Sequence, residues 1–215
     1  MTAPHPSPSR VVRLWADQRG IAMFELSAVL PFLLLVGLGS MEITANILAR
    51  KRVYEIGRMV VDNAARISDG NAMQASTVRE SDINDLLLGA QLQGGTLNLS
   101  SNGRIILTSL ETNAQGGQWI HWQRCYGNAH FSSAYRAGQG AHGLGFAGIQ
   151  YGGQSIQARP GDAVMFVEIA YDYRPMVSMN WAGYGTQRFV AAFAMNVRDK
   201  RSLAGLSPDA PAATC

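Results

Sequence analysis

Gly20 and Glu25, near the N-terminus, are the first residues whose types suggest a chemical event. A peptidase that cuts at a membrane face needs a residue without a side chain before the bond, so that the backbone can enter its site, and Gly20 is such a residue. Cleavage there would free the α-amino group of Ile21. The Glu25 carboxylate of a neighbouring copy could pair with that group and set the axial register between copies in a low-dielectric environment. We therefore expect cleavage between Gly20 and Ile21 and a register role for Glu25.

The element that must carry Glu25 is a long apolar segment. Between Ile21 and Leu48 only Glu25 and Glu42 are charged, and positions 26–41 carry no charge. About 20 apolar residues are enough for one bilayer span at about 1.5 Å per residue. A carboxylate at the start of a span is costly, so Glu25 either has the role in assembly or lies at the headgroup boundary in contact with water.

This apolar segment also contains residues that permit a kink or close packing of membrane helices. Pro31, Gly37 and Gly39 lie inside it, and neighbouring helices can satisfy the backbone groups that such residues free. No Ala-x-Ala-like site follows promptly, so the segment differs from a secretory signal that is removed. We predict a transmembrane half-helix over 21–48 behind a cleaved leader, 1–20. Its leucines include Leu26, Leu33, Leu34 and Leu35.

Beyond the apolar segment the helical pattern continues with an amphipathic character. Apolar residues recur there at spacings of three and four, which places them on one face of a helix. They are Ala49, Val53, Ile56, Val60, Ala64 and Ile67. We therefore predict one helix over 21–67, with an amphipathic half over 49–68. The alternative is a plain membrane anchor followed by a separate helix.

The remaining chain, 69–215, is predicted to form a sheet domain. A weaker helix is expected over 81–88, with Ser81 as its N-cap and Gly89 as its end. Asn102-Gly103, between two short apolar–polar runs, predicts a hairpin.

The sequence predicts three further strands, at 119–125, 163–173 and 188–197. The glycine-rich stretch 126–161 predicts an irregular loop with at most short strands. The predicted fold class is therefore α+β, in which the long N-terminal helix packs on an antiparallel sheet of about four to five strands.

Cys125 and Cys215 are the two cysteines, and Cys215 is the last residue of the sequence. A terminal cysteine far from any other fits neither a zinc ribbon nor a CxxC redox motif. A disulfide that ties down the C-terminal tail is the simpler interpretation, and it requires an oxidising compartment such as the periplasm. Two unrelated free thiols are the alternative.

The pattern Gly-x-x-x-x-Glu from Gly20 to Glu25 resembles the prepilin peptidase site of type IV pilins. The following sequence, 24–35 (FELSAVLPFLLL), resembles the start of the TadE-like pseudopilins of the tight-adherence (Flp) pilus system. The strand over 161–175 resembles a later segment of that family. One departure is that Phe24 precedes the glutamate, whereas the family commonly has the aromatic residue after it.

The resemblance implies a structural subunit rather than an enzyme, processed by a prepilin peptidase after Gly20. The chain is far larger than a major Flp pilin, which implies a minor pilin or pseudopilin needed to assemble a pilus for adhesion and biofilm formation. The implied partners are other Tad pilins and pseudopilins and the inner-membrane assembly platform. The implied location is the inner membrane, with a single span, a cytoplasmic N-terminus and a periplasmic domain, before the subunit enters the pilus.

Two rival functions share the same anchor. The first is an uncleaved bitopic inner-membrane protein with a periplasmic binding domain. The second is a membrane-anchored enzyme that uses His121, His130 and His142, although their spacings match no common metal-ligand pattern. We expect no metal, no cofactor and no catalytic residue. The formal net charge of +3 is not the strongly basic balance of a nucleic-acid binder.

Overall fold

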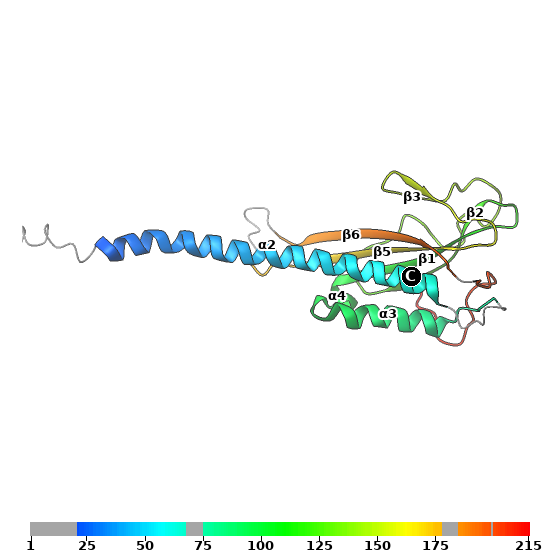
Figure 1. Cartoon of the computed structure of the whole chain (residues 1–215), viewed down its shortest axis with the longest axis horizontal. Coiled ribbons are helices and arrows are strands. Elements are labelled where there is room, and N and C mark those ends of the chain that lie inside the picture. The colour runs from blue at the N-terminus through cyan, green and yellow to red at the C-terminus, as the bar shows by residue number, and fades with distance from the viewer. Residues whose placement is uncertain (1–20, 68–74, 178–184, 199) are drawn as a thin grey trace, which may run out of the picture. The chain divides into compact units, whose positions relative to one another are not determined.

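The computed structural model describes four segments of the chain, 21–67, 75–177, 185–198 and 200–215. The chain divides into two compact units, which meet in the sequence between Ala45 and Asn46. Helix α2 (Ile21–Arg66) runs through this boundary (Figure 1). The single helix expected over 21–67 is therefore confirmed.

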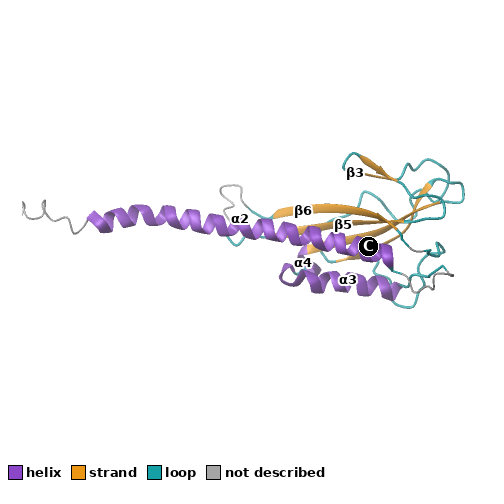
Figure 2. Ribbon diagram, in the orientation of Figure 1, coloured by secondary structure: helices purple, strands orange, loops and turns teal. Residues whose placement is uncertain are grey.

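The other elements, coloured by type in Figure 2, belong to the second unit. They are α3 (Glu80–Gly94), the 3-10 helix η2 (Gly95–Leu97), α4 (Leu99–Asn102), β1 (Gly103–Thr112), β2 (Gln118–Tyr126), β3 (Ile149–Tyr151), β4 (Gln154–Ile156), β5 (Val164–Tyr173) and β6 (Gln187–Asn196). Four strands form one antiparallel sheet in the order β2-β1-β5-β6, and β3 pairs with β4 in a separate ribbon. The predicted α+β class is confirmed.

The second half of α2 packs on one face of the sheet, because its apolar residues lie on one side of the helix. Val53, Ile56 and Val60 are fully buried and share a core with Ile105 of β1 and Val167 of β5. Burying one side chain of this kind stabilises a fold by about 1.5–3 kcal/mol relative to exposing it. The charged side chains of the same stretch stay exposed, as in Arg50, Lys51, Glu55 and Arg58.

Helix α2 and strand β6 come close together at Gly57. A Cβ atom added to Gly57 would lie 2.5 Å from Cε2 of Phe193 and 3.0 Å from Cγ2 of Ile169. A normal carbon–carbon contact is about 3.5–4.0 Å, so only glycine fits here without a shift of a neighbour. Tyr54, on the same part of α2, packs edge-on against the Phe193 ring at a centroid distance of 5.8 Å.

The glycine-rich stretch 126–161 covers the opposite face of the sheet. Ile149 of β3 is buried against Leu110, Ile120 and Phe166 of the sheet. Figure 1 shows β3 and α3 on opposite sides of the sheet. The prediction of an irregular loop with short strands is confirmed, since β3 and β4 have three residues each.

Helix α3 corrects the prediction for the second helix. It spans Glu80–Gly94, so Ser81 lies inside its first turn rather than at the N-cap, and Gly89 lies in its interior. A glycine inside a helix costs only about 1 kcal/mol relative to alanine. Leu87 and Ala90, on either side of Gly89, are buried in the core. Their burial outweighs the cost of the glycine, and the helix continues past it.

The hairpin predicted around Asn102-Gly103 is wrong. The residues expected to form its first strand are helical, because η2 and α4 carry Leu97 and Leu99 into the core. The turn between β1 and β2 lies instead at Asn113, whose Oδ1 accepts a hydrogen bond from the N–H of Gly117 at 2.9 Å. An asparagine side chain that binds the backbone in this way can define a turn without an Asn-Gly pair.

Covalent and polar contacts hold the C-terminal tail. Cys125 and Cys215 form the predicted disulfide, with their Cα atoms 4.9 Å apart. The N–H of Cys125 also donates to the carbonyl oxygen of Ala213 at 2.8 Å. The hydroxyl of Ser81 donates to Oδ2 of Asp209 at 2.6 Å. The tail therefore links edge strand β2 to helix α3.

Candidate membrane and assembly segment

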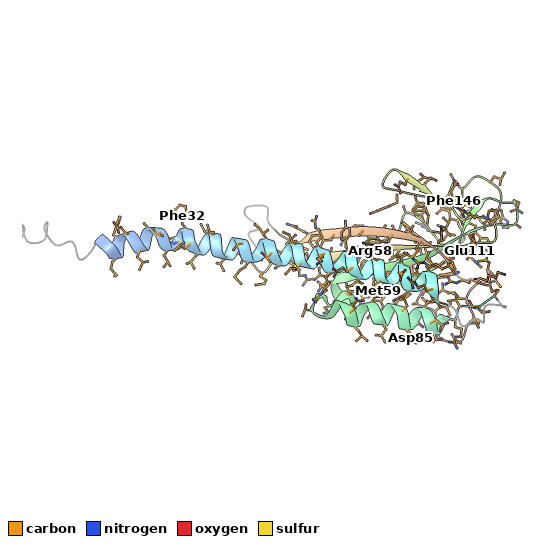
Figure 3. The ribbon with its side chains drawn as sticks, in the orientation of Figure 1. Phe32, Arg58, Met59, Asp85, Glu111 and Phe146 are labelled. Carbon is orange, nitrogen blue, oxygen red and sulfur yellow. A yellow bond between two sulfur atoms is a disulfide. The ribbon has the colours of Figure 1, made fainter. Side chains whose placement is uncertain are left out.

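The first part of α2 exposes nearly all of its large apolar side chains. Phe24 is 76% exposed and Leu34 is 54% exposed, and Figure 3 shows Phe32 projecting from the helix. A folded soluble protein rarely leaves so large a continuous apolar surface in water. By length and composition, α2 is able to cross a membrane. The exposed residues are Met23, Phe24, Leu26, Val29, Leu30, Phe32, Leu33, Leu34, Leu35, Val36, Leu38, Met41, Ile43, Ile47 and Leu48.

The hydroxyl groups within this apolar part donate hydrogen bonds to the helix's own backbone. Ser27 Oγ donates to the carbonyl oxygen of Phe24, and Ser40 Oγ to that of Gly37, each at 2.8 Å. Thr44 Oγ1 donates to the carbonyl oxygen of Ser40 at 2.8 Å. A helix in lipid has no water to satisfy its polar groups, so internal bonds of this kind suit a membrane segment.

The two carboxylates of the segment have different surroundings. Glu25 is exposed, and it lies about one helical turn after Ile21 in the sequence of α2. Glu42 is only 5% exposed. Gly20, on the other side of the expected cut, lies outside the described residues. Cleavage and the register role of Glu25 therefore stay predictions.

The helix-perturbing residues lie on an open part of α2. Pro31 is inside the helix, which continues through it. Apart from adjacent residues and the helix's own backbone, no described atom lies within 4 Å of the position that a Cβ would take at Gly37 or Gly39. A bare backbone surface of this kind is what allows a second helix to approach closely in a membrane. The predicted leucines flank these positions with 54–67% of their surface exposed: Leu26, Leu33, Leu34 and Leu35.

Of the histidines considered for an enzymatic site, His121 pairs with a carboxylate. His121 Nδ1 lies 2.8 Å from Oε2 of Glu111, and the hydroxyl of Ser109 donates to the other oxygen, Oε1, at 2.7 Å. A serine nucleophile must bond to the imidazole, whereas Ser109 bonds to the carboxylate. The described residues contain no group of three or more His, Cys, Asp or Glu side chains that could hold a metal ion.

A buried ion pair that no sequence pattern indicated joins α3 to β2. Arg124 Nε donates to Oε2 of Glu80 at 2.8 Å, and Arg124 also bonds through its terminal nitrogen to Oε1. The two side chains are 16% and 6% exposed. Their residues are far apart in the sequence, so only the pairing of the two elements brings them together.

A second buried carboxylate, Glu168 of β5, lies on the sheet face that the glycine-rich stretch covers. It is 8% exposed, and its Oε2 has no hydrogen-bond partner among the described residues. Burial raises the pKa of the Glu168 carboxyl above its ordinary value, while a hydrogen bond with Ser133 lowers it. On the same strand, the pKa of Asp172 is lowered, chiefly by its hydrogen bonds with Arg188.

Comparison of the chain with protein-family models, with curated proteins and with solved structures found no match.

Proposed function

We propose that this chain is a membrane-anchored structural subunit, a minor pseudopilin similar to the TadE-like proteins of the tight-adherence pilus. In this proposal a prepilin peptidase removes residues 1–20. The apolar half of α2 then holds the subunit in the inner membrane, with the sheet domain in the periplasm. The subunit later joins a pilus together with other Tad pilins and pseudopilins at the assembly platform.

The observation that carries the proposal is the division of α2 into two halves of opposite character. The first half exposes its apolar side chains on all sides, and the second half buries a single face against the sheet. An all-apolar helix surface is stable in lipid or against other such helices. The same surface can therefore anchor the subunit and later pack in a filament, because helix packing there replaces contact with lipid.

The Cys125–Cys215 disulfide supports the periplasmic location of the sheet domain. Disulfides persist in oxidising compartments and are rare in the cytoplasm. With the disulfide in the periplasm and a single span, the N-terminus lies in the cytoplasm. The basic residues before the span fit this orientation, in line with the positive-inside tendency. They are Arg10, Arg13 and Arg19.

The decisive test is the N-terminus of the mature protein. The full-length chain is expressed in cells with an active prepilin peptidase, purified from membranes, and its intact mass is measured. We expect a product that begins at Ile21, and an uncleaved product from cells whose peptidase is inactive. A Gly20→Leu variant should keep its leader in both strains, because a side chain before the bond hinders entry into the peptidase site.

An intact leader in the active strain, while a known prepilin in the same cells is cut, would contradict the proposal. That result would favour the uncleaved bitopic protein with a periplasmic binding domain.

A further inference from the structure

The two edges of the main sheet differ in how they are covered. Along β2, the N–H of Ile120 donates to the carbonyl oxygen of Gln139 at 2.9 Å, and the N–H of Cys125 donates to Ala213 at 2.8 Å. Along β6, within the described part of the chain, no backbone hydrogen bond is made on the side away from β5. β6 is therefore an open edge.

The register identifies the backbone groups that point outward from β6. The N–H of Val197 donates to the carbonyl oxygen of Ala163 at 2.9 Å, so odd-numbered residues bond to β5 in this pairing. The even-numbered residues direct their N–H and C=O groups to the open side. They are Arg188, Val190, Ala192, Ala194 and Asn196.

Apart from Arg188 near its start, β6 lacks the usual protections against pairing with another chain. From Phe189 to Val197 the sequence has no charged residue, no proline and no glycine. The strand pairs with β5 over ten consecutive residues without a bulge. Soluble proteins normally shield such an edge with charges, prolines or bulges, because an unshielded edge is a template for a further strand.

A groove lies beside the edge, between β6 and the second half of α2. Its volume is about 700 Å³, and its apolar lining includes Met59, Val61, Phe193 and Met195. Arg58 and Arg198 line it as well, and Figure 3 labels Arg58 and Met59 on this part of α2. A strand added to β6 would direct every second side chain toward this groove.

The charge around the groove is positive. Asp62 is its one lining carboxylate, and it lies 3.4 Å from Arg198 and 3.1 Å from Arg66. Arg58 makes no ion pair with any described residue. An acidic residue on an added strand would therefore meet an unpaired guanidinium.

We infer that β6 and this groove bind an extended segment of another protein, which adds to the sheet as a fifth strand. The backbone hydrogen bonds hold the segment, its alternate apolar side chains enter the groove, and an acidic side chain pairs with Arg58. Recognition of this kind combines main-chain bonds for affinity with side-chain pockets for specificity. The inference goes beyond the proposed function, since it applies whether or not the leader is removed.

A second copy of this chain does not fit the edge. β6 runs in the same direction as the second half of α2, since Asn46 at the beginning of that half contacts Gln187 at the start of β6, and Asp62 near its end contacts Arg198 just after β6. An antiparallel β6–β6 pair would point the two α2 helices in opposite directions, and both could not enter one membrane from the same side. In either orientation a second β6 would bring no acidic side chain to Arg58, because this strand carries none.

The test uses the purified full-length chain in detergent micelles and a fluorescent ten-residue peptide with apolar residues at alternate positions and one aspartate. Fluorescence anisotropy reports binding, and a scrambled peptide of the same composition is the control. We expect the alternating peptide to bind at least tenfold more tightly than the scrambled one. Hydrogen exchange should show new protection at the amides of Val190, Ala192 and Ala194.

Two variants locate the interaction. Ala194→Pro removes an outward N–H and leaves the bonds to β5 in place, so it should weaken binding at least tenfold, whereas Ala194→Ser keeps the N–H and should bind normally. Arg58→Glu should lower the affinity for the aspartate peptide and raise the affinity for a version that carries lysine in place of the aspartate. This variant introduces no proline, so its result is independent of whether β6 tolerates one.

The inference would be overturned if the scrambled peptide bound as tightly as the alternating one, or if Arg58→Glu left the affinity for the aspartate peptide unchanged. It would also be overturned if the peptide protected amides elsewhere in the chain from hydrogen exchange. A dimer that forms without peptide and is lost in Ala194→Pro would overturn the choice of occupant.

Discussion

At the residue scale, Glu25 is the charged group whose position is hardest to explain by folding alone. Its side chain is exposed on a largely apolar stretch of helix, away from the buried core. A carboxylate at the start of a membrane span has a cost, and such a group is by default a functional candidate. The α-amino group of a processed Ile21 is the partner that the proposed function supplies.

The first prediction follows from that pairing. Glu25→Ala should abolish pilus assembly while it leaves leader removal and the folding of the sheet domain unchanged. Pili sheared from cells and the mass of the membrane-bound protein measure the two effects. Glu55→Ala removes a carboxylate that is also exposed on α2 and should assemble normally. Normal pili from the Glu25→Ala strain would exclude the register role.

The second prediction concerns Glu168, whose burial raises its pKa. Below the unfolded pKa of about 4.3 the side chain is neutral in both states. As the pH rises through the folded pKa, the folded state is increasingly penalised relative to the unfolded state, which ionises freely. Glu168→Gln should therefore raise the free energy of unfolding at pH 7–8 by roughly 1 kcal/mol, and the gain should vanish near pH 4.

Asp172 provides a control of opposite sign, because Arg188 lowers its pKa. A lowered pKa contributes stability above the unfolded pKa, and this contribution is lost as the pH falls. Asp172→Asn should therefore reduce the melting temperature at pH 7 but not near pH 2–3. The reduction should be small, because the pair is partly exposed and screened by solvent. Thermal unfolding across pH 2–8 measures both variants, and parallel curves for the two would contradict the assignment.

At the element scale, α2 combines two surfaces that ordinarily belong to different helices. Its first half has the all-round apolar character of a membrane helix, and its second half has the single apolar face of a helix on a sheet. The second surface depends on Gly57, where the helix meets Phe193 of β6. The position of α2 on the sheet therefore depends on a residue that has no side chain.

The third prediction compares two glycines inside helices. Gly57→Ala should destabilise the protein by roughly 1–2 kcal/mol, because the overlap with Phe193 and Ile169 outweighs the better helix propensity of alanine. Gly89 of α3 has open space around the same position, so Gly89→Ala should stabilise by roughly 0.5–1 kcal/mol. Chemical denaturation measures both. If Gly57→Ala raised the free energy of unfolding as much as Gly89→Ala does, the overlap at Gly57 would have no cost.

At the scale of the whole molecule, the C-terminal tail joins parts of the second unit that are distant in sequence. It contacts α3 through Asp209 and β2 through the disulfide. The disulfide closes a loop with a sequence separation of 90 residues. A cross-link over a loop of that length stabilises a fold by about 4–5 kcal/mol in the chain-entropy model, as an upper value.

The fourth prediction is that removal of this cross-link frees the tail before it unfolds the sheet. Replacing both cysteines with serine should lower the free energy of unfolding by roughly 2–4 kcal/mol. It should also increase hydrogen exchange at the amide of Cys125 and at Ser81, which bind the tail. A reductant should reproduce the effect in the natural chain and have none in the variant. Unchanged exchange at these amides would mean that polar contacts alone hold the tail.

Several features could be predicted from the sequence. They are the long helix with its two halves, the disulfide, and the strands at 119–125, 163–173 and 188–197. The reason is that each rests on local information. Apolar periodicity over many turns identifies α2, an alternating run of β-branched and aromatic residues identifies a strand, and two cysteines allow one pairing. The same applies to the exposed segment around Glu25, since its composition alone indicates a helix able to cross a membrane.

Tertiary structure decided what short segments do and which side chains meet. Leu97 and Leu99 alternate with polar residues as in a strand, yet they lie in two short helices and pack in the core. The sequence predicts that Gly89 ends α3, but the helix continues past it because residues on both sides, Leu87 and Ala90, are buried. The Glu80–Arg124 pair and the open edge of β6 depend on which elements are neighbours. Long-range packing energies determine those neighbours, and no local pattern in the chain records them.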